Sequence, residues 1–127
     1  MLRAAPSPKR KFGIRKPSTH HNADHRAWIR TRACLVSNAD CRAQDVQCCH
    51  VREGTDGYLG GKPSDFWCWP GCFYHHTEQH NIGEKSFQAK YRLDLKAVAL
   101  DFAWMSPIKA TREAVAIYEA RQQGILP

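Results

Sequence analysis

The sequence predicts an α+β domain in which a two-stranded hairpin and the helix after it are surrounded by further helices. Two short stretches rich in β-favouring residues, 45–52 and 66–70, flank a glycine-rich loop. The pattern from residue 84 to residue 124 is helical instead. A chain of 127 residues suffices for one domain with a modest core. The predicted divisions are a basic flexible arm at 1–19 and a domain at 20–127, with its core at about 33–92 and its C-terminal helices at 94–123.

The first nineteen residues, MLRAAPSPKRKFGIRKPST, are basic and contain no acidic residue. Three prolines disfavour a packed element, and the charge suits contact with a polyanion, either nucleic acid or an acidic membrane surface. A solvated start that binds nothing explains the composition as well. The candidate nucleic-acid contacts in this arm are Lys9, Arg10, Lys11, Arg15 and Lys16.

Neither a membrane span nor an export signal is visible in the sequence. No stretch approaches the ~20 apolar residues of a spanning helix, and the N-terminus has no apolar run. We therefore predict a cytoplasmic protein that does not enter a membrane. In a reducing compartment, thiols or metal ligands are favoured over disulfides for the six cysteines, although their even number also fits a disulfide-bonded secreted protein.

Each element up to the return strand has its own signal. A cap at Thr19 or Asn22 predicts a short amphipathic helix. Its apolar residues are Ala23, Ala27, Trp28 and Ile29. The stretch DVQCCHVR alternates like a strand and has His50 near its end. Residues 54–61 include four glycines and predict a loop. FWCWP reads as the return strand, closed by Pro70 and Gly71.

Four helices are predicted after the return strand. CFYHHTEQH begins the first, and residues 84–91 form the second. Asp94 caps the third. The fourth is predicted to have Ser106 as its cap, Pro107 in its first turn and Gly124 as its stop. Its inward-facing candidates are Val115 and Tyr118. The aromatic residues expected to pack rather than to stack on bases are Trp67, Trp69, Phe73 and Tyr74.

Two pairs of metal-ligating residues predict a structural zinc site. Cys34 with Cys41 and Cys72 with His75 lie about thirty residues apart, as in zinc modules that hold two loops together. The six residues between Cys34 and Cys41 are more than the usual two to four. The remaining cysteines are alternative ligands or buried thiols: Cys48, Cys49 and Cys68.

Three histidines form a second set. His76 and His80 are spaced i and i+4, so they lie on one face of a helix and can share a metal ion. His50, from the preceding strand, could act on a water beside that ion. Phosphodiester hydrolysis needs this combination of a charge-neutralising metal and a base with a pKa near neutral. The simpler interpretation is a solvent-facing His80 and a hydrogen-bonded core His50.

Together these motifs resemble those of the HNH endonucleases, the ββα-metal superfamily. The stretches that carry the resemblance are CCHVR, the glycine loop, KPSD, WP.C..HHTEQH and GEKSF. They are most similar to an uncharacterised prophage subgroup in which a CLVC-type knuckle precedes HVR or HLR, a GxKxSD loop and PLCxxHHxxxH. The likeness covers about residues 25 to 104, and it implies a ββα-metal hairpin-helix core with a zinc knuckle.

The resemblance implies a role for each matching residue. His50 corresponds to the general base, and His76 and His80 correspond to ligands of the catalytic ion. Asp65 stands where asparagine is common, so it would orient the base, hold the loop or reach the metal. The residues matching the structural zinc knuckle are Cys34, Cys72 and His75.

Three positions depart from the family pattern. Ser37 stands at the second knuckle cysteine, so either Cys41 replaces that ligand through a longer loop or the zinc site is lost. Gly71 replaces a leucine, which removes a core side chain and adds backbone freedom. Cys49 stands where some relatives have another histidine before His50.

The function implied is that of a metal-dependent endonuclease of phage or prophage origin that hydrolyses DNA, or RNA. Its cofactors would be a structural Zn²⁺ and a catalytic Mg²⁺, Mn²⁺, Ni²⁺ or Zn²⁺. Imidazole ligands favour zinc, nickel or cobalt, whereas participation of Asp65 favours magnesium or manganese. Nucleic-acid contacts expected near the site are Arg52, Lys62, Lys85, Lys90 and Arg92. The alternative is a non-catalytic, zinc-stabilised nucleic-acid-binding accessory protein, which would not need the three histidines together.

Overall fold

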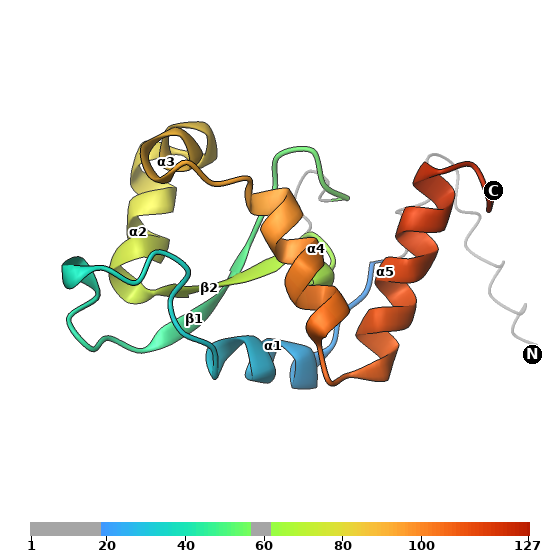
Figure 1. Ribbon diagram of the computed structural model, residues 1–127, viewed down its shortest axis with the longest axis horizontal. Coiled ribbons are helices and arrows are strands. Elements are labelled where there is room, and N and C mark those ends of the chain that lie inside the picture. Colours follow the sequence, from blue (N-terminus) through green and yellow to red (C-terminus); the bar gives the residue numbers. More distant parts are fainter. Residues whose placement is uncertain (1–18, 57–61) are drawn as a thin grey trace, which may run out of the picture.

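The computed structural model describes residues 19–56 and 62–127. Within these ranges it contains five α-helices and a two-stranded antiparallel sheet, which confirms the α+β class (Figure 1). In chain order the elements are α1 (Ala23–Arg30), β1 (Val46–His50), β2 (Cys68–Cys72), α2 (Phe73–Ile82), α3 (Glu84–Tyr91), α4 (Leu95–Met105) and α5 (Lys109–Gln122), with 3-10 turns at Ala39–Cys41 and Asp65–Trp67. No helix in these ranges has the length and apolar character needed to cross a membrane.

Two predicted features lie outside the described residues. They are the basic arm, apart from Thr19, and positions 57–61 of the glycine-rich loop. The predicted nucleic-acid contacts at Lys9, Arg10, Lys11, Arg15 and Lys16 therefore have no structural description.

The sheet is shorter than predicted, and its second strand begins later. The register pairs Val46 with Cys72 and His50 with Cys68. Phe66 belongs to a 3-10 turn, so it does not open the return strand. Pro70 was predicted to close that strand but lies inside it, because the outer edge of β2 does not require its missing N–H group. The Pro70 carbonyl accepts a hydrogen bond of 2.9 Å from the Leu35 N–H at that edge.

Gly71 also lies inside β2, where close packing requires a residue without a side chain. A Cβ atom at this position would lie 2.6 Å from the Trp69 ring and 2.8 Å from the Cys49 sulfur. The sequence suggested that glycine removes a core side chain here. In the structure the Trp69 indole occupies that space, so a leucine could not be accommodated.

Replacing Gly71 by alanine should therefore lower the free energy of unfolding by about 1–3 kcal/mol, the usual cost of overpacking. Urea denaturation measures the difference from the parent protein. Because the Cys49 sulfur is one of the two obstacles, the double variant Gly71→Ala/Cys49→Ala should lose less than the sum of its single variants. Strictly additive losses would contradict this explanation.

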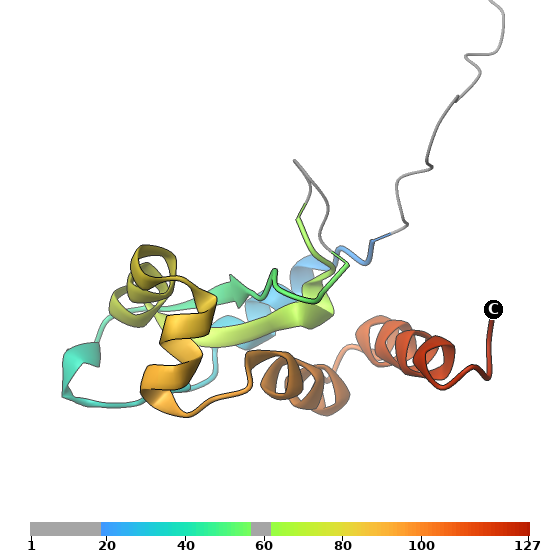
Figure 2. The ribbon, with the colours of Figure 1, turned by 90° about the horizontal axis from the view of Figure 1, so that it is seen from above.

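The core lies between the sheet and the C-terminal helices. Trp67, Trp69 and Phe87 are fully buried, together with Leu95 from α4 and Val115 from α5. Tyr118 packs edge-on against Trp67, with ring centroids 4.9 Å apart. The predicted inward positions on the last helix are therefore confirmed. Figure 2 shows α4 and α5 on the opposite side of the sheet from α2.

Two predicted details of the outer helices are wrong. In α1, capped by Asn22, the buried residues are His25 and Ile29, whereas the predicted apolar residue Ala27 is exposed. Helix α5 begins at Lys109 rather than after Ser106. The Ser106 hydroxyl instead contacts Nδ1 of the buried His25, at 2.8 Å, and accepts from the Ile108 N–H.

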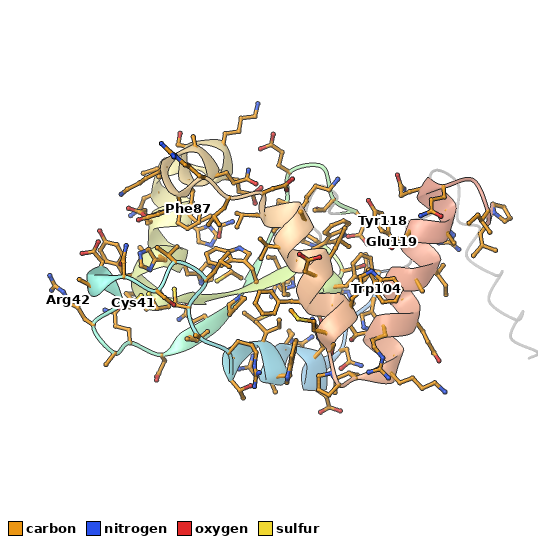
Figure 3. The ribbon with its side chains drawn as sticks, in the orientation of Figure 1. Cys41, Arg42, Phe87, Trp104, Tyr118 and Glu119 are labelled. Atoms are coloured by element: carbon orange, nitrogen blue, oxygen red, sulfur yellow. The ribbon has the colours of Figure 1, made fainter. Side chains whose placement is uncertain are left out.

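Different kinds of residue lie towards the two ends of the molecule (Figure 3). Cys41 lies on the loop at the end occupied by α2 and α3. At the other end, Nε1 of Trp104 in α4 donates a 3.0 Å hydrogen bond to Glu119 in α5. The metal-ligating residues gather at the first end.

Candidate metal centre and histidine cleft

Four metal-ligating side chains meet where the loop before β1 returns against the start of α2. The ligand atoms of Cys34, Cys41, Cys72 and His75 all lie within 4.8 Å of one another. Nδ1 of His75 lies 3.5 Å from the sulfurs of Cys34 and Cys41. It lies 3.2 Å from the sulfur of Cys72. This four-ligand cluster can hold a structural metal ion, as the sequence predicted.

Hydrogen bonding alone does not explain the four-ligand cluster. An imidazole nitrogen has either one hydrogen or one lone pair, yet three sulfurs surround this one. In a tetrahedral zinc site, bonds of ~2.3 Å to sulfur and ~2.05 Å to nitrogen place the two ligand atoms about 3.6 Å apart. The observed distances of 3.2 to 3.5 Å are close to that value. The residues therefore fit zinc.

The sequence of the loop explains how Cys41 reaches the cluster. The Asn38 side chain accepts a 3.0 Å hydrogen bond from the Asp40 N–H and so caps the 3-10 turn that ends at Cys41. Ser37 is exposed, and its hydroxyl donates to the Cys34 carbonyl. Of the two alternatives that the sequence left open, the structure shows Cys41 in the cluster in place of residue 37.

The pKa values of two thiols in the cluster, Cys34 and Cys72, are shifted in opposite directions. Burial disfavours the Cys34 thiolate, but backbone N–H groups, first that of Cys72, donate to its sulfur and lower its pKa. Burial and the neighbouring Cys41 and Cys34 raise the pKa of Cys72 to about 11. A cation between the sulfurs would favour the ionised form of Cys72. None of the six cysteines, all within the described ranges, forms a disulfide.

A cleft of about 620 Å³ opens between β1, α1 and α2. We call it the histidine cleft. Its lining comprises the three histidines His50, His76 and His80, the basic residues Arg26, Arg30, Arg52 and Lys62, and Gln47, Cys48, Gln79, Gly83 and Glu84. Four cationic side chains and one carboxylate give it a positive formal charge, which favours a polyanion.

His50 is held in the cleft by the buried carboxylate of Asp65. Nε2 of His50 lies 2.9 Å from Oδ1 of Asp65. The other carboxylate oxygen accepts from Arg26 and, at 2.6 Å, from the Asn22 N–H. Because a carboxylate only accepts hydrogen bonds, Nε2 of His50 carries the hydrogen and Nδ1 keeps the lone pair. Asp65 is thus placed to orient His50.

Asp65 is ionised because its partners outweigh its burial. Burial alone would raise its pKa, but the hydrogen bonds from His50, Asn22 and Arg26 lower the pKa to about 2. A carboxylate with a lowered pKa stabilises the fold above its ordinary pKa, near 4. That contribution is lost as the pH falls from about 4 towards 2.

Replacing Asp65 by asparagine should therefore lower the free energy of unfolding at neutral pH by about 2 kcal/mol. The exposed Asp101 provides the matched control, and Asp101→Asn should change stability by less than about 0.5 kcal/mol. Urea denaturation from pH 7 downwards should show a constant gap between the two variants until about pH 4. Equal stabilities at neutral pH would show that the carboxylate is not held as described.

His76 and His80 present their Nε2 atoms to each other at 3.1 Å. Two nitrogens at ~2.1 Å from one ion are about 3.0 Å apart at an octahedral angle and about 3.4 Å apart at a tetrahedral one. Nδ1 of His76 donates to Oε1 of Gln47 at 2.6 Å, which leaves Nε2 with its lone pair. Burial, then His80 and His50, lower the pKa of His76 and favour the neutral form that a metal binds.

The three histidines line one cleft but do not form one compact ligand set. Within residues 19–56 and 62–127, the ligand atoms of His50, His76 and His80 do not all lie within 4.8 Å of one another. This arrangement suits a pair of ligands with a base beside it better than it suits three ligands.

Several residues differ from the predicted site. The sequence did not indicate Gln47, Arg26 or Arg30 as cleft residues, although the i and i+4 spacing of the two arginines on α1 was a usable signal. Lys90 does not line the cleft and instead pairs with Glu78 at 2.6 Å. The other basic candidates that do not line it are Lys85 and Arg92. Phe73, expected to pack in the core or at the knuckle, is exposed. Tyr74 is also exposed, but its ring packs edge-on against the ring of His75 in the four-ligand cluster, as expected, with centroids 5.1 Å apart.

Comparison of the chain with protein-family models, with curated proteins and with solved structures finds no match in any of the three.

Proposed function

We propose that this protein is a metal-dependent endonuclease that hydrolyses phosphodiester bonds in DNA. The observation that carries the proposal is the histidine cleft: an imidazole oriented by a buried carboxylate and a facing pair of imidazoles, in a basic depression. The order of β1, β2 and α2 and the resemblance to HNH endonucleases support the same reading.

In the proposed reaction His50 is the general base. Its Nδ1 takes the proton of the attacking water, since Nε2 donates to Asp65. Asp65 keeps the ring in this tautomer and stabilises the imidazolium that forms. With a pKa of about 2, Asp65 stays ionised throughout the neutral range and does not compete for the proton. It is therefore a positioning residue.

His76 and His80 would hold the divalent ion through their Nε2 atoms, and Gln47 would fix the orientation of the His76 ring. The ion, when bound, supplies positive charge that offsets the charge developing on the phosphate and the leaving oxygen. Imidazole ligands favour Zn²⁺, Ni²⁺ or Co²⁺ over Mg²⁺. The Asp65 carboxylate already accepts hydrogen bonds from His50, Arg26 and Asn22. It is therefore less available as the oxygen ligand that would favour Mg²⁺ or Mn²⁺.

Substrate binding would depend on the basic rim of the cleft. Arg30 and Lys62 line the cleft and are exposed to solvent. Each phosphate that such a side chain neutralises steepens the salt dependence of binding to duplex DNA by about 0.9 in log–log slope. Arg26 contributes less to binding because its guanidinium pairs with Asp65.

The test is incubation of supercoiled plasmid with the protein and Mg²⁺, Mn²⁺, Ni²⁺, Co²⁺ or Zn²⁺ in turn. The proposal expects conversion to nicked or linear plasmid with at least one ion and none after chelation. A gel-retention assay runs in parallel. Retention of the plasmid without cleavage under every ion would instead favour a non-catalytic, zinc-stabilised nucleic-acid-binding protein, for which the four-ligand cluster suffices.

A further inference from the structure

We infer that Cys48, His50 and Cys68 form a second metal site, one for a thiophilic cation, and that its occupation withdraws His50 from catalysis. The two sulfurs and a ring nitrogen of His50 all lie within 4.8 Å of one another. The metal-binding part of this inference rests on that geometry alone. The regulatory part rests on the proposed function.

The strand pairing brings the three ligands together. Cys48 and His50 are two positions apart on β1, so their side chains leave the same face of the sheet. Cys68 on β2 is the register partner of His50. The backbone therefore fixes all three positions, and an ion needs to draw the ligand atoms together by only about 1 Å to reach tetrahedral spacing.

The donor set selects the kind of ion. Two thiolates and one imidazole favour Zn²⁺, Cd²⁺ or Cu⁺ over Mg²⁺ or Mn²⁺. Cys68 is fully buried, whereas Cys48 and His50 are partly exposed and line the histidine cleft. One side of the site thus opens to solvent, which suits an exchangeable ion, in contrast to the more buried four-ligand cluster.

Occupation of this site conflicts with base catalysis. Nε2 of His50 donates to Asp65, and Nδ1 has the lone pair that would accept the water's proton. A cation on Nδ1 removes that lone pair, and a cation on Nε2 displaces the hydrogen bond to Asp65 that orients the ring. An ion of the wrong kind would therefore switch the nuclease off, although the ion-binding pair His76 and His80 remains intact.

Cadmium NMR on the full-length protein tests the site independently of activity. Under a phosphine reductant, the cadmium-loaded parent should give two sulfur-shifted signals, one from the four-ligand cluster and one from Cys48, His50 and Cys68. Cys48→Ser should abolish the second signal and keep the first. Cys68→Ala is the second variant, and circular dichroism checks that both are folded. Cys49→Ala is the matched control on the same strand, with its side chain on the opposite face, and should keep both signals.

A single sulfur-shifted signal in the parent, or a second signal that survives in both Cys48→Ser and Cys68→Ala, would overturn the site. The regulatory part is tested by adding Cd²⁺ to a nicking reaction supported by Mg²⁺, Mn²⁺ or Ni²⁺. The parent should be inhibited, and Cys48→Ser should need at least about tenfold more Cd²⁺, because loss of even an outer partner of a ligand costs ~10–100-fold in affinity.

Equal inhibition of parent and Cys48→Ser would overturn the regulatory part. A parent that shows both cadmium signals but fails to nick DNA with any of the ions tested would contradict the proposed function, and with it the regulatory part. The metal site would still stand.

Discussion

His50→Ala should reduce plasmid nicking by about 100- to 10,000-fold, the contribution that a positioned general base makes to a rate. The variant removes the only cleft imidazole that Asp65 orients among the described residues. It leaves the His76 and His80 pair and the four-ligand cluster untouched, so the zinc ion of that cluster should be retained and the circular dichroism spectrum should match that of the parent. Single-turnover nicking with the ion that best supports the parent measures the effect.

The matched control for this variant is His21→Ala. His21 is an exposed histidine outside the cleft, so its removal tests the general cost of losing an imidazole. It should leave the rate unchanged within about twofold, because surface substitutions away from special features have small effects. If His50→Ala nicked as fast as His21→Ala, the assignment of His50 as base would be wrong.

Removal of the zinc that we propose for the four-ligand cluster should be the most destabilising single change to the fold. Structural zinc in small domains contributes an apparent ~10–16 kcal/mol, and whole domains are stable by only about 5–15 kcal/mol. The four-ligand cluster joins the 3-10 turn at Ala39–Cys41 to the junction of β2 and α2, and few apolar side chains are buried in that loop. A strong chelator should therefore unfold at least this end of the molecule, as followed by circular dichroism and by zinc content.

Two cysteine variants separate zinc loss from cavity formation. Cys72→Ala and Cys49→Ala remove equally buried thiols, 1% and 0% exposed, but only Cys72 belongs to the four-ligand cluster. Cys72→Ala should lose the bound zinc and most of its stability. Cys49→Ala should keep one zinc in the cluster and lose only the packing of one sulfur. Similar zinc contents and melting temperatures for the two variants would rule out the cluster as a structural zinc site.

Local signals in the sequence were sufficient for parts of the site. The i and i+4 spacing placed His76 and His80 one turn apart, because helical geometry is independent of the rest of the fold. The Cys72 and His75 pair is similar, since both residues lie at one helix start. In each case a few neighbouring residues determine the geometry.

Other parts depended on tertiary contacts that no local pattern contains. The register of β1 and β2 brings Cys68 opposite His50, but a long loop joins the strands, and a slip of one residue would turn every side chain to the other face. Gln47 reaches His76 only because α2 packs against β1. Helix α1 was predicted from its cap, yet its docking through buried His25 and through Arg26 became visible only in the fold.

The predicted apolar residues of α1 are only partly buried, for a related reason: Ile29 is buried, whereas Ala23 and Ala27 are exposed. Ala27 has a favourable helix propensity but little surface to bury, whereas His25 is buried because Ser106 satisfies its Nδ1. Gly71 is a similar case. Glycine is required at this position because the ring of Trp69, from the same strand, occupies the space that a side chain would need. Neither partner could be recognised without the three-dimensional packing.

Anomalous diffraction from crystals of the protein soaked with Ni²⁺ or Mn²⁺ tests the proposed catalytic site most directly. We expect an ion peak shared by Nε2 of His76 and Nε2 of His80, with the His50 ring one water molecule away across the cleft. An ion located elsewhere, or a His50 ring turned away from that pair, would contradict the proposed site.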